Sequence, residues 1–158
     1  MVVDDFHIDA MTAHLVRRAQ DFDVSLTENM FGDIFSDLAG EISDSLGTAP
    51  SSQRLRRHRH GPGLHGSAPD IAGRNIANPA AMIHSGAMLF AWRAARHGDP
   101  VLTATAKLIE RGVAGVIASG VSTRDLGGSA STTEFTAAVV EAATGDGEQS
   151  WSGWTTRD

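Results

Sequence analysis

Two aspartates, Asp33 and Asp37, are the residues whose type and spacing most directly suggest chemistry. Apolar residues recur around them at three- and four-residue steps, which predicts a helix: Phe31, Ile34, Phe35, Leu38 and Ile42. On a helix, this spacing places both carboxylates on one face, where they repel each other unless a cation lies between them. Hard divalent ions such as Mg²⁺ prefer carboxylate oxygen. The pair is therefore a candidate metal site, although spacing alone favours a solvated acidic helix face.

The segments around this helix have patterns of their own. Residues 22–26 alternate apolar and polar side chains, which predicts a short strand. The chain then enters a tight turn that contains Gly32, and we expect the following helix to end near Leu46-Gly47, because glycine is a common helix stop. An earlier helix is predicted over residues 6–19.

A loop rich in glycine and proline runs from residue 65 to residue 79. Gly66 and Gly73 permit positive φ and a close approach of the backbone to a ligand. Asn78-Pro79 then predicts a helix start, with Asn78 as the N-cap and Pro79 in the first turn. A loop that leads into a helix is a plausible anion or nucleotide site. The Gly-x-Gly-x-x-Gly motif is absent, so a Rossmann domain is unsupported.

Three further helices are predicted in the second half of the chain. Residues 80–95 are apolar on nearly all sides, which is typical of a buried helix. Residues 101–119 follow, with Ala104 and Leu108 on one face, and with two internal glycines, Gly112 and Gly115, that suggest close helix packing. A capping box formed by Ser131 and Glu134 predicts the last helix, which ends near Thr144-Gly145. Residues 146–158 have no period and are expected to be a disordered tail.

Composition restricts the class of protein. The chain has 158 residues, 41% of them hydrophobic and 20% charged, as in a soluble globular protein. Its net charge of −6 argues against nucleic acid as the main partner. Without cysteine, neither a disulfide framework nor a thiolate zinc site is available. No apolar run of ~18 residues predicts a membrane span, and the N-terminus lacks a signal-peptide pattern, so we expect a cytoplasmic protein.

Residues 51–64 do not fit the surrounding pattern. They contain four arginines and two histidines and have no apolar period. A basic patch for phosphate or nucleic acid and a metal site at His58 and His60 are possible interpretations, and a solvated, mobile loop is the favoured one. The chain has one lysine against twelve arginines, as expected of a GC-rich gene. Two compensating frameshifts around residues 52–64 are therefore a further hypothesis, which resequencing tests.

Three strings resemble segments of one enzyme family, in that family's order and spacing. They are TENMFGDIFSD at residues 27–37, HGSAPDIAG with IANP at residues 65–79, and TRDLGG at residues 123–128. They resemble the metal segment, the cofactor loop and the C-terminal segment of the β-decarboxylating dehydrogenases, which act on isopropylmalate, isocitrate and tartrate or malate. The isopropylmalate branch is the most similar. The resemblance covers residues 3–50 and 64–145, which correspond only to the family's C-terminal part.

The resemblance implies a fold and a domain organisation. The chain is expected to be α/β, a helix-rich C-terminal fragment of the three-layer α/β/α isopropylmalate dehydrogenase-like fold. Residues 1–43 would belong to the small, dimer-forming, metal-binding domain, and residues 44–145 to the large NAD-binding domain. Residues 51–64 would be an aberrant basic loop within it, and residues 146–158 would lie outside the family.

The resemblance also implies ligands. Asp33 and Asp37 would bind Mg²⁺ or Mn²⁺ together with Asp9 from a neighbouring subunit, whereas spacing alone makes Asp9 a first-turn acid that the helix dipole favours. Asp70 would bind the adenine ribose hydroxyls and repel a 2′-phosphate, which favours NAD over NADP. The full set of cofactor residues is His65, Gly66, Ser67, Ala68, Asp70, Ile71 and Asn78.

The family's catalytic groups are missing from the matched part. Its base and acid are a lysine and a tyrosine, and arginines hold the substrate; all lie upstream of the part resembled here. The chain has no tyrosine, and Lys107 lies within a predicted helix. We therefore predict no catalytic residue and no activity for the chain alone, with a second copy or a complementary N-terminal half as partner. A tartrate/malate or isocitrate substrate, and a non-catalytic nucleotide-binding or interaction remnant, are the alternatives.

Overall fold

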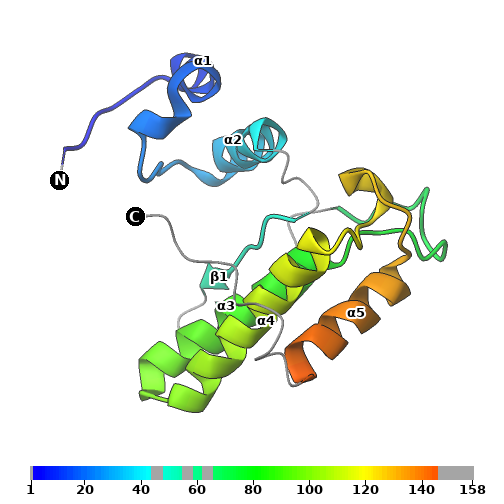
Figure 1. Cartoon of the computed structure of the whole chain (residues 1–158). Helices are drawn as coiled ribbons and strands as arrows, with labels where there is room; N and C mark the ends of the chain where they lie inside the picture. The colour runs from blue at the N-terminus through cyan, green and yellow to red at the C-terminus, as the bar shows by residue number, and fades with distance from the viewer. Residues whose placement is uncertain (1, 44–47, 55–58, 62–65, 146–158) are drawn as a thin grey trace. The chain divides into compact units, whose positions relative to one another are not determined.

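The structure is a computed structural model that describes residues 2–43, 48–54, 59–61 and 66–145 (Figure 1). The chain divides into two compact units, residues 1–46 and residues 47–158, and each is described by itself. The expected tail of residues 146–158 lies outside the described residues. No helix among the described residues is long and apolar enough to cross a membrane.

The first unit consists of two helices and an extended segment. Helix α1 spans Ile8–Arg18 and continues into the 3₁₀ turn η1, Ala19–Asp21, and α2 spans Asn29–Ile42. The Phe6, His14 and Phe22 rings lie within 6.5 Å of one another, centroid to centroid. Leu15 and Gly40 are the buried residues of α1 and α2. So few buried side chains give this unit a small core of its own.

Three predictions for the first unit were wrong in detail. Residues 22–26 form no strand and include a bend at Asp23, because no other described segment of this unit supplies a partner for the ladder. Gly32 lies in the first turn of α2 rather than before it, and a Cβ there would meet Thr27 Cγ2 at 3.3 Å. The helix ends at Ile42 because Ser43 caps it: the Ser43 hydroxyl donates to the Ala39 carbonyl over 2.7 Å.

The second unit is built on three helices. Helices α3, Ala80–His97, and α4, Pro100–Ala118, form a hairpin, and α5, Thr132–Thr144, packs along α4 (Figure 1). Gly98 makes the hairpin turn at φ 65°, and Asp99 caps α4 by accepting from the Val101 and Leu102 N–H groups. The shared core lies between the helices and consists of Ala80, Val113, Val116, Phe135 and Val139.

Close packing of α4 against α5 confirms one prediction from glycine spacing. Gly112 is buried, and a Cβ on it would meet the Val139 carbonyl oxygen at 3.3 Å and the Ala143 Cβ at 3.4 Å. The capping box at the start of α5 is also confirmed, with Ser131 and Glu134 as its two members. The helix ends at Thr144, with Gly145 as its C-cap residue.

The structure shows which faces of α3 and α4 are covered. Met82 and Phe90 of α3 are 49% and 39% exposed, because the described residues of the unit cover only part of this helix. Ala104 and Leu108 share one face of α4, as their spacing predicted, and that face is exposed, whereas Ala106 and Val113 lie on the inner face. A helix that is apolar on several sides gives no signal for which side meets its neighbour.

The start of α3 differs by one residue from the prediction. The helix begins at Ala80, so that Pro79 occupies the N-cap position and lies outside the first turn. The side-chain oxygen of Asn78 still accepts a hydrogen bond from the Ala80 N–H over 2.9 Å. Asn78 therefore stabilises the helix start from one position further out.

The described part of the basic segment, residues 51–54 and 59–61, is more ordered than the expected loop. Strand β1, Gln53–Arg54, pairs antiparallel with β2, Arg59–His60. The Ser51 N–H donates to the Ser85 hydroxyl of α3 over 3.1 Å, and a Cβ on Gly61 would meet Leu89 at 3.1 Å. These contacts join residues more than twenty positions apart, so no local pattern could predict them. His58 lies outside the described residues, and so do residues 62–64.

Candidate functional site

The loop before α3 is folded by its own backbone. The Ile71 N–H donates to the Ala68 carbonyl and the Arg74 N–H to the Ile71 carbonyl, each over 3.1 Å. Gly73 supports this double turn at φ 74°, a conformation that L side chains rarely adopt. Asp70 lies in the first turn with its side chain exposed.

Asn75 fastens the loop to the start of α5. Its side-chain oxygen accepts from the Thr133 N–H and hydroxyl over 3.2 and 2.9 Å, and its carbonyl accepts from the Thr132 N–H over 3.0 Å. The Thr132 hydroxyl donates to the Ala77 carbonyl over 2.6 Å. Asn75 holds φ at 55°, a left-handed conformation that asparagine tolerates better than most residues. The loop is thus fixed at its C-terminal side.

A second connection joins the loop to the segment after α4. The Asn78 amide donates from Nδ2 to Asp125 Oδ2 over 2.7 Å. The other oxygen of Asp125 accepts from the hydroxyl of Thr123, which is fully buried, over 2.5 Å. Asp125 belongs to the short 3₁₀ turn η2, Arg124–Leu126, which Gly127 ends at φ 79°. Two strings that are 47 positions apart therefore meet through one carboxylate.

The predicted cofactor residues occupy different environments. Gly66, Ser67 and Asp70 are exposed, and Ala68 and Ile71 are half-buried within the double turn. The Asp70 carboxylate has no hydrogen-bond partner among the described residues, so it is available to a ligand. Asn78 differs, because both ends of its amide contact protein atoms and at least part of its role is structural. His65 lies outside the described residues.

The predicted metal ligands lie on two helices of the first unit. Asp33 and Asp37 are exposed on α2 and four residues apart, as the sequence indicated. Asp9 is exposed in the first turn of α1, where its Oδ1 accepts from the Ala10 N–H over 2.8 Å. Within the described residues, no three acidic or histidine side chains come together as a metal site. Asp9 therefore does not complete a site with the pair on α2 inside this chain.

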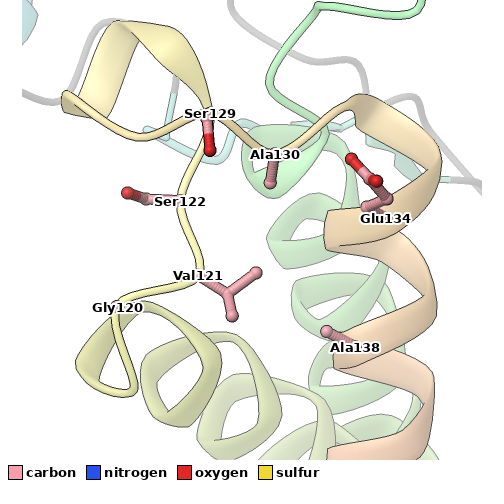
Figure 2. A pocket seen from close by; sticks show the side chains of 7 residues that line it. All are labelled: Gly120, Val121, Ser122, Ser129, Ala130, Glu134 and Ala138. Carbon is pink, nitrogen blue, oxygen red and sulfur yellow. The ribbon is translucent and has the colours of Figure 1, made fainter.

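A pocket of about 470 Å³ lies beside α5 (Figure 2). It lies between the two loop segments that flank η2 and the first turns of α5, and it is lined by Gly120, Val121, Ser122, Ser129, Ala130, Glu134 and Ala138. Figure 2 shows Val121 extending from its loop toward Ala138. None of the predicted cofactor or metal residues lines this pocket.

The one carboxylate of the pocket is committed to the capping box. Glu134 Oε2 accepts from the Ser131 N–H and hydroxyl, each over 2.8 Å. The backbone N–H first, and then the hydroxyl, lower the pKa of Glu134 below its ordinary value. A carboxylate held ionised in this way is a weak general base, so the pocket offers no group suited to acid–base catalysis.

Asp125 and Asn75 are the residues that the sequence predictions missed. Both position the loop through contacts with segments 47 and 58 positions away. Thr123 and Asp125, two residues apart, are a local signal for a side-chain hydrogen bond, and asparagine is the residue most tolerant of positive φ after glycine. Neither signal indicates the distant partner.

Comparison with known proteins places this geometry in a family. A model of the isocitrate/isopropylmalate dehydrogenase family matches residues 2–139. The chain belongs to that family.

Individual relatives agree with this assignment. The chain is 43% identical over 143 residues to 3-isopropylmalate dehydrogenase of Bacillus cereus, a match that covers 88% of this chain and 38% of the relative. It is 46% identical over 142 residues to 3-isopropylmalate dehydrogenase of Rhodopirellula baltica, over 84% of this chain and 37% of the relative. The chain thus spans less than two fifths of the length of these relatives.

Solved structures show the same fold. The crystal structure of isocitrate dehydrogenase from Methylococcus capsulatus superposes with a TM-score of 0.75 at 40% identity, over 86% of this chain and 39% of that one. A Thermus thermophilus protein superposes with a TM-score of 0.78 at 34% identity, over 90% of this chain and 28% of that one. The fold is therefore a helix-rich part of the family's α/β fold, as the resemblance predicted.

Proposed function

We propose that this chain is the C-terminal part of an NAD- and Mg²⁺-dependent dehydrogenase of the 3-isopropylmalate type, which oxidises and decarboxylates a 2-hydroxy acid. The observation that carries the proposal is the Asn78–Asp125 hydrogen bond, because it joins the cofactor-loop string to the third family string in one folded unit. The names of the curated relatives support the isopropylmalate substrate. A role in leucine biosynthesis is proposed from the family resemblance.

The cofactor half of the site is assigned to the folded loop. The exposed, unpaired Asp70 carboxylate fits two ribose hydroxyls, since it can accept a hydrogen bond on each oxygen. The same negative charge disfavours a 2′-phosphate, which supports NAD. Gly66 and Gly73 lie on either side of Asp70 and give the cofactor access to the backbone. From the family resemblance, His65 and Asn78 are assigned as contacts of the adenine.

The metal half is assigned to α2. Asp33 and Asp37 supply exposed carboxylate oxygens on one helix face, which suits a hard cation such as Mg²⁺ or Mn²⁺. A bound divalent cation would polarise the hydroxyl and carboxylate oxygens of the substrate. Because Asp9 does not join this pair within the chain, we assign it to the site of a second copy. The metal site is then complete only in a dimer.

Catalysis needs groups that this chain does not contain. It has no tyrosine, and its one lysine, Lys107, is exposed on α4. We therefore propose that the chain is inactive alone and that a polypeptide corresponding to the uncovered part of its relatives supplies the base, the acid and the substrate-binding arginines. The proposal divides the chain as the sequence did, into residues 1–43 for metal and dimer contacts and residues 44–145 for NAD.

Reconstitution tests this proposal. The chain is mixed with the part of the Bacillus cereus relative that it does not cover, and NADH formation from 3-isopropylmalate is followed with Mg²⁺. We expect activity from the mixture and none from either part alone. We also expect no activity when the chain in the mixture carries Asp33→Asn. Turnover of isocitrate or malate instead would reassign the substrate. A mixture that binds NAD and stays inactive on all three acids would contradict the enzymatic proposal.

The alternative of a non-catalytic interaction protein has one observation in its favour. Large apolar side chains of the first unit are strongly exposed, among them Val24 at 87% and Leu26 at 97%. Exposed apolar surface of this kind marks a contact with another chain. A complementary half would cover the same residues in the enzymatic proposal, so the reconstitution experiment separates the two functions.

A further inference from the structure

Two arginines share one tryptophan where the basic segment meets α3. The Arg59 guanidinium carbon, on β2, lies 5.5 Å from the centroid of the Trp92 ring, and that of Arg96, one turn further along α3, lies at the same 5.5 Å. The two cations are therefore separated by no more than twice this distance. Cation–π contacts hold both side chains in place on the ring. Their mutual repulsion favours an anion beside them.

The two guanidiniums lack acidic partners. In the part of the chain that the structure describes, the one ion pair joins Arg18 to Asp21, in the other unit. The nearest acidic residue along the sequence, Asp99, has its carboxylate engaged as the N-cap of α4. The positive charge of Arg59 and Arg96 is thus left without a carboxylate among the described residues.

Arg59 also has a donor without an acceptor. Its Nη1 donates to the Ser52 hydroxyl over 2.9 Å, but its Nε–H is buried and has no hydrogen-bond partner among the described residues. Leaving a buried donor of a charged group unpaired is unfavourable. Because Nε is covered, an oxyanion would approach the half-buried Arg59 from the Nη2 side, where the planar guanidinium fork matches phosphate oxygens.

This cluster is separate from the proposed cofactor site. Trp92 is twelve residues into α3 from Ala80, where the loop of residues 66–79 ends, which corresponds to about 18 Å along the helix axis. Neither Asp70 nor Asn78 contributes to it. A ligand of the cluster would therefore use neither of the contacts assigned to Asp70 and Asn78.

We propose that Arg59, Arg96 and Trp92 form a binding site for a small phosphate-bearing anion, with pyrophosphate as the simplest ligand. Nucleic acid fits less well for two reasons. The guanidiniums already occupy the ring on which a base would stack, and the chain as a whole carries a net charge of −6. Inorganic sulfate, which has a similar shape and less charge, is expected to bind more weakly.

Tryptophan fluorescence tests the site directly. The chain has three tryptophans, so Trp151→Phe and Trp154→Phe are introduced together to leave Trp92 as the only indole. Pyrophosphate is then titrated at low and at physiological salt. We expect a saturable change in Trp92 emission, and about tenfold weaker binding for both Arg59→Gln and Arg96→Gln, as loss of one charge-assisted contact predicts.

Matched variants separate a specific site from general charge. Arg111→Gln removes the same charge from the exposed surface of α4 and is expected to bind like the parent. Arg96 is exposed, so Arg96→Gln tests the site even if Arg59→Gln disrupts the pairing of β1 with β2. Equal weakening by Arg111→Gln, or no change in Trp92 emission at 10 millimolar pyrophosphate (about the upper limit for a specific site), would overturn the proposal. So would a single-stranded oligonucleotide that displaces pyrophosphate at micromolar strand concentration.

Discussion

The Asn78 amide donates to the Asp125 carboxylate over 2.7 Å, although the two residues are 47 positions apart. This bond links the loop that precedes α3 to the turn that precedes α5. The second oxygen of Asp125 accepts from the buried Thr123 hydroxyl of its own segment, so that one side chain both orders its turn and fixes the loop to it. The geometry of the proposed cofactor loop depends on this carboxylate.

Replacing Asp125 is therefore expected to destabilise the second unit. Asp125→Ala removes both hydrogen bonds and leaves the Thr123 hydroxyl buried without its acceptor, which should lower the free energy of unfolding by about 1–3 kcal/mol. Chemical denaturation followed by circular dichroism measures the loss. Glu141→Gln, an exposed change on α5, is the control and should be nearly neutral. Equal stability of Asp125→Ala and the wild type would show that the bridge contributes nothing.

Two helical glycines give opposite predictions for the same substitution. A Cβ on Gly86 of α3 would meet no neighbouring atom within 4 Å, so Gly86→Ala should raise stability by about 0.5–1 kcal/mol. Gly112 of α4 lies against the Val139 carbonyl, so Gly112→Ala should lack this gain and Gly112→Val should lower stability by about 1–3 kcal/mol. Thermal unfolding of the three variants and the wild type measures the order of their stabilities. A stabilised Gly112→Val would contradict the close packing of α4 and α5.

Acid is expected to weaken the second unit through His84. Burial lowers the pKa of this α3 imidazole below its ordinary value of 6.5, although the Glu110 carboxylate opposes the shift. The unfolded state then binds the proton more readily than the folded state. Stability is therefore full above the unfolded pKa and falls as the pH drops below about 6.5 toward the lower pKa of the folded state.

The contribution of His84 is measured by comparing the pH dependence of the unfolding free energy in the wild type and in variants. His84→Gln should flatten the pH dependence of the unfolding free energy below about pH 6.5, whereas His97→Gln removes an exposed imidazole and serves as the control. A profile that is as steep in His84→Gln as in the wild type would assign the acid sensitivity to other groups.

Local signals predicted most of the helices and few of their contacts. The Ser131–Glu134 capping box and the Gly112 packing position were visible because each depends on spacing within one element. The prediction of a strand over residues 22–26 was wrong because strand formation requires a partner that the described part of the unit does not supply. The pairing of β1 with β2 was missed for the opposite reason, since it depends on ladder bonds and on contacts of the neighbouring residues with α3.

In the candidate site, too, local patterns could be predicted and long-range contacts could not. Asp33 and Asp37 could be placed on one helix face from spacing, and the family strings indicated the loop around Asp70. The roles of Asn75 and Asp125 depend on segments far away in the sequence, which no pattern in a single chain encodes.

The most direct test of the proposed function is the melting temperature of the chain with NAD and Mg²⁺. A ligand that binds only the folded state raises the melting temperature by mass action. We predict a shift with NAD that is larger than with NADP, that Asp70→Ala abolishes, and that Asp23→Ala, an exposed change in the first unit, preserves. An equal shift in Asp70→Ala, or no shift at millimolar NAD, would contradict the assignment of this loop as the cofactor site.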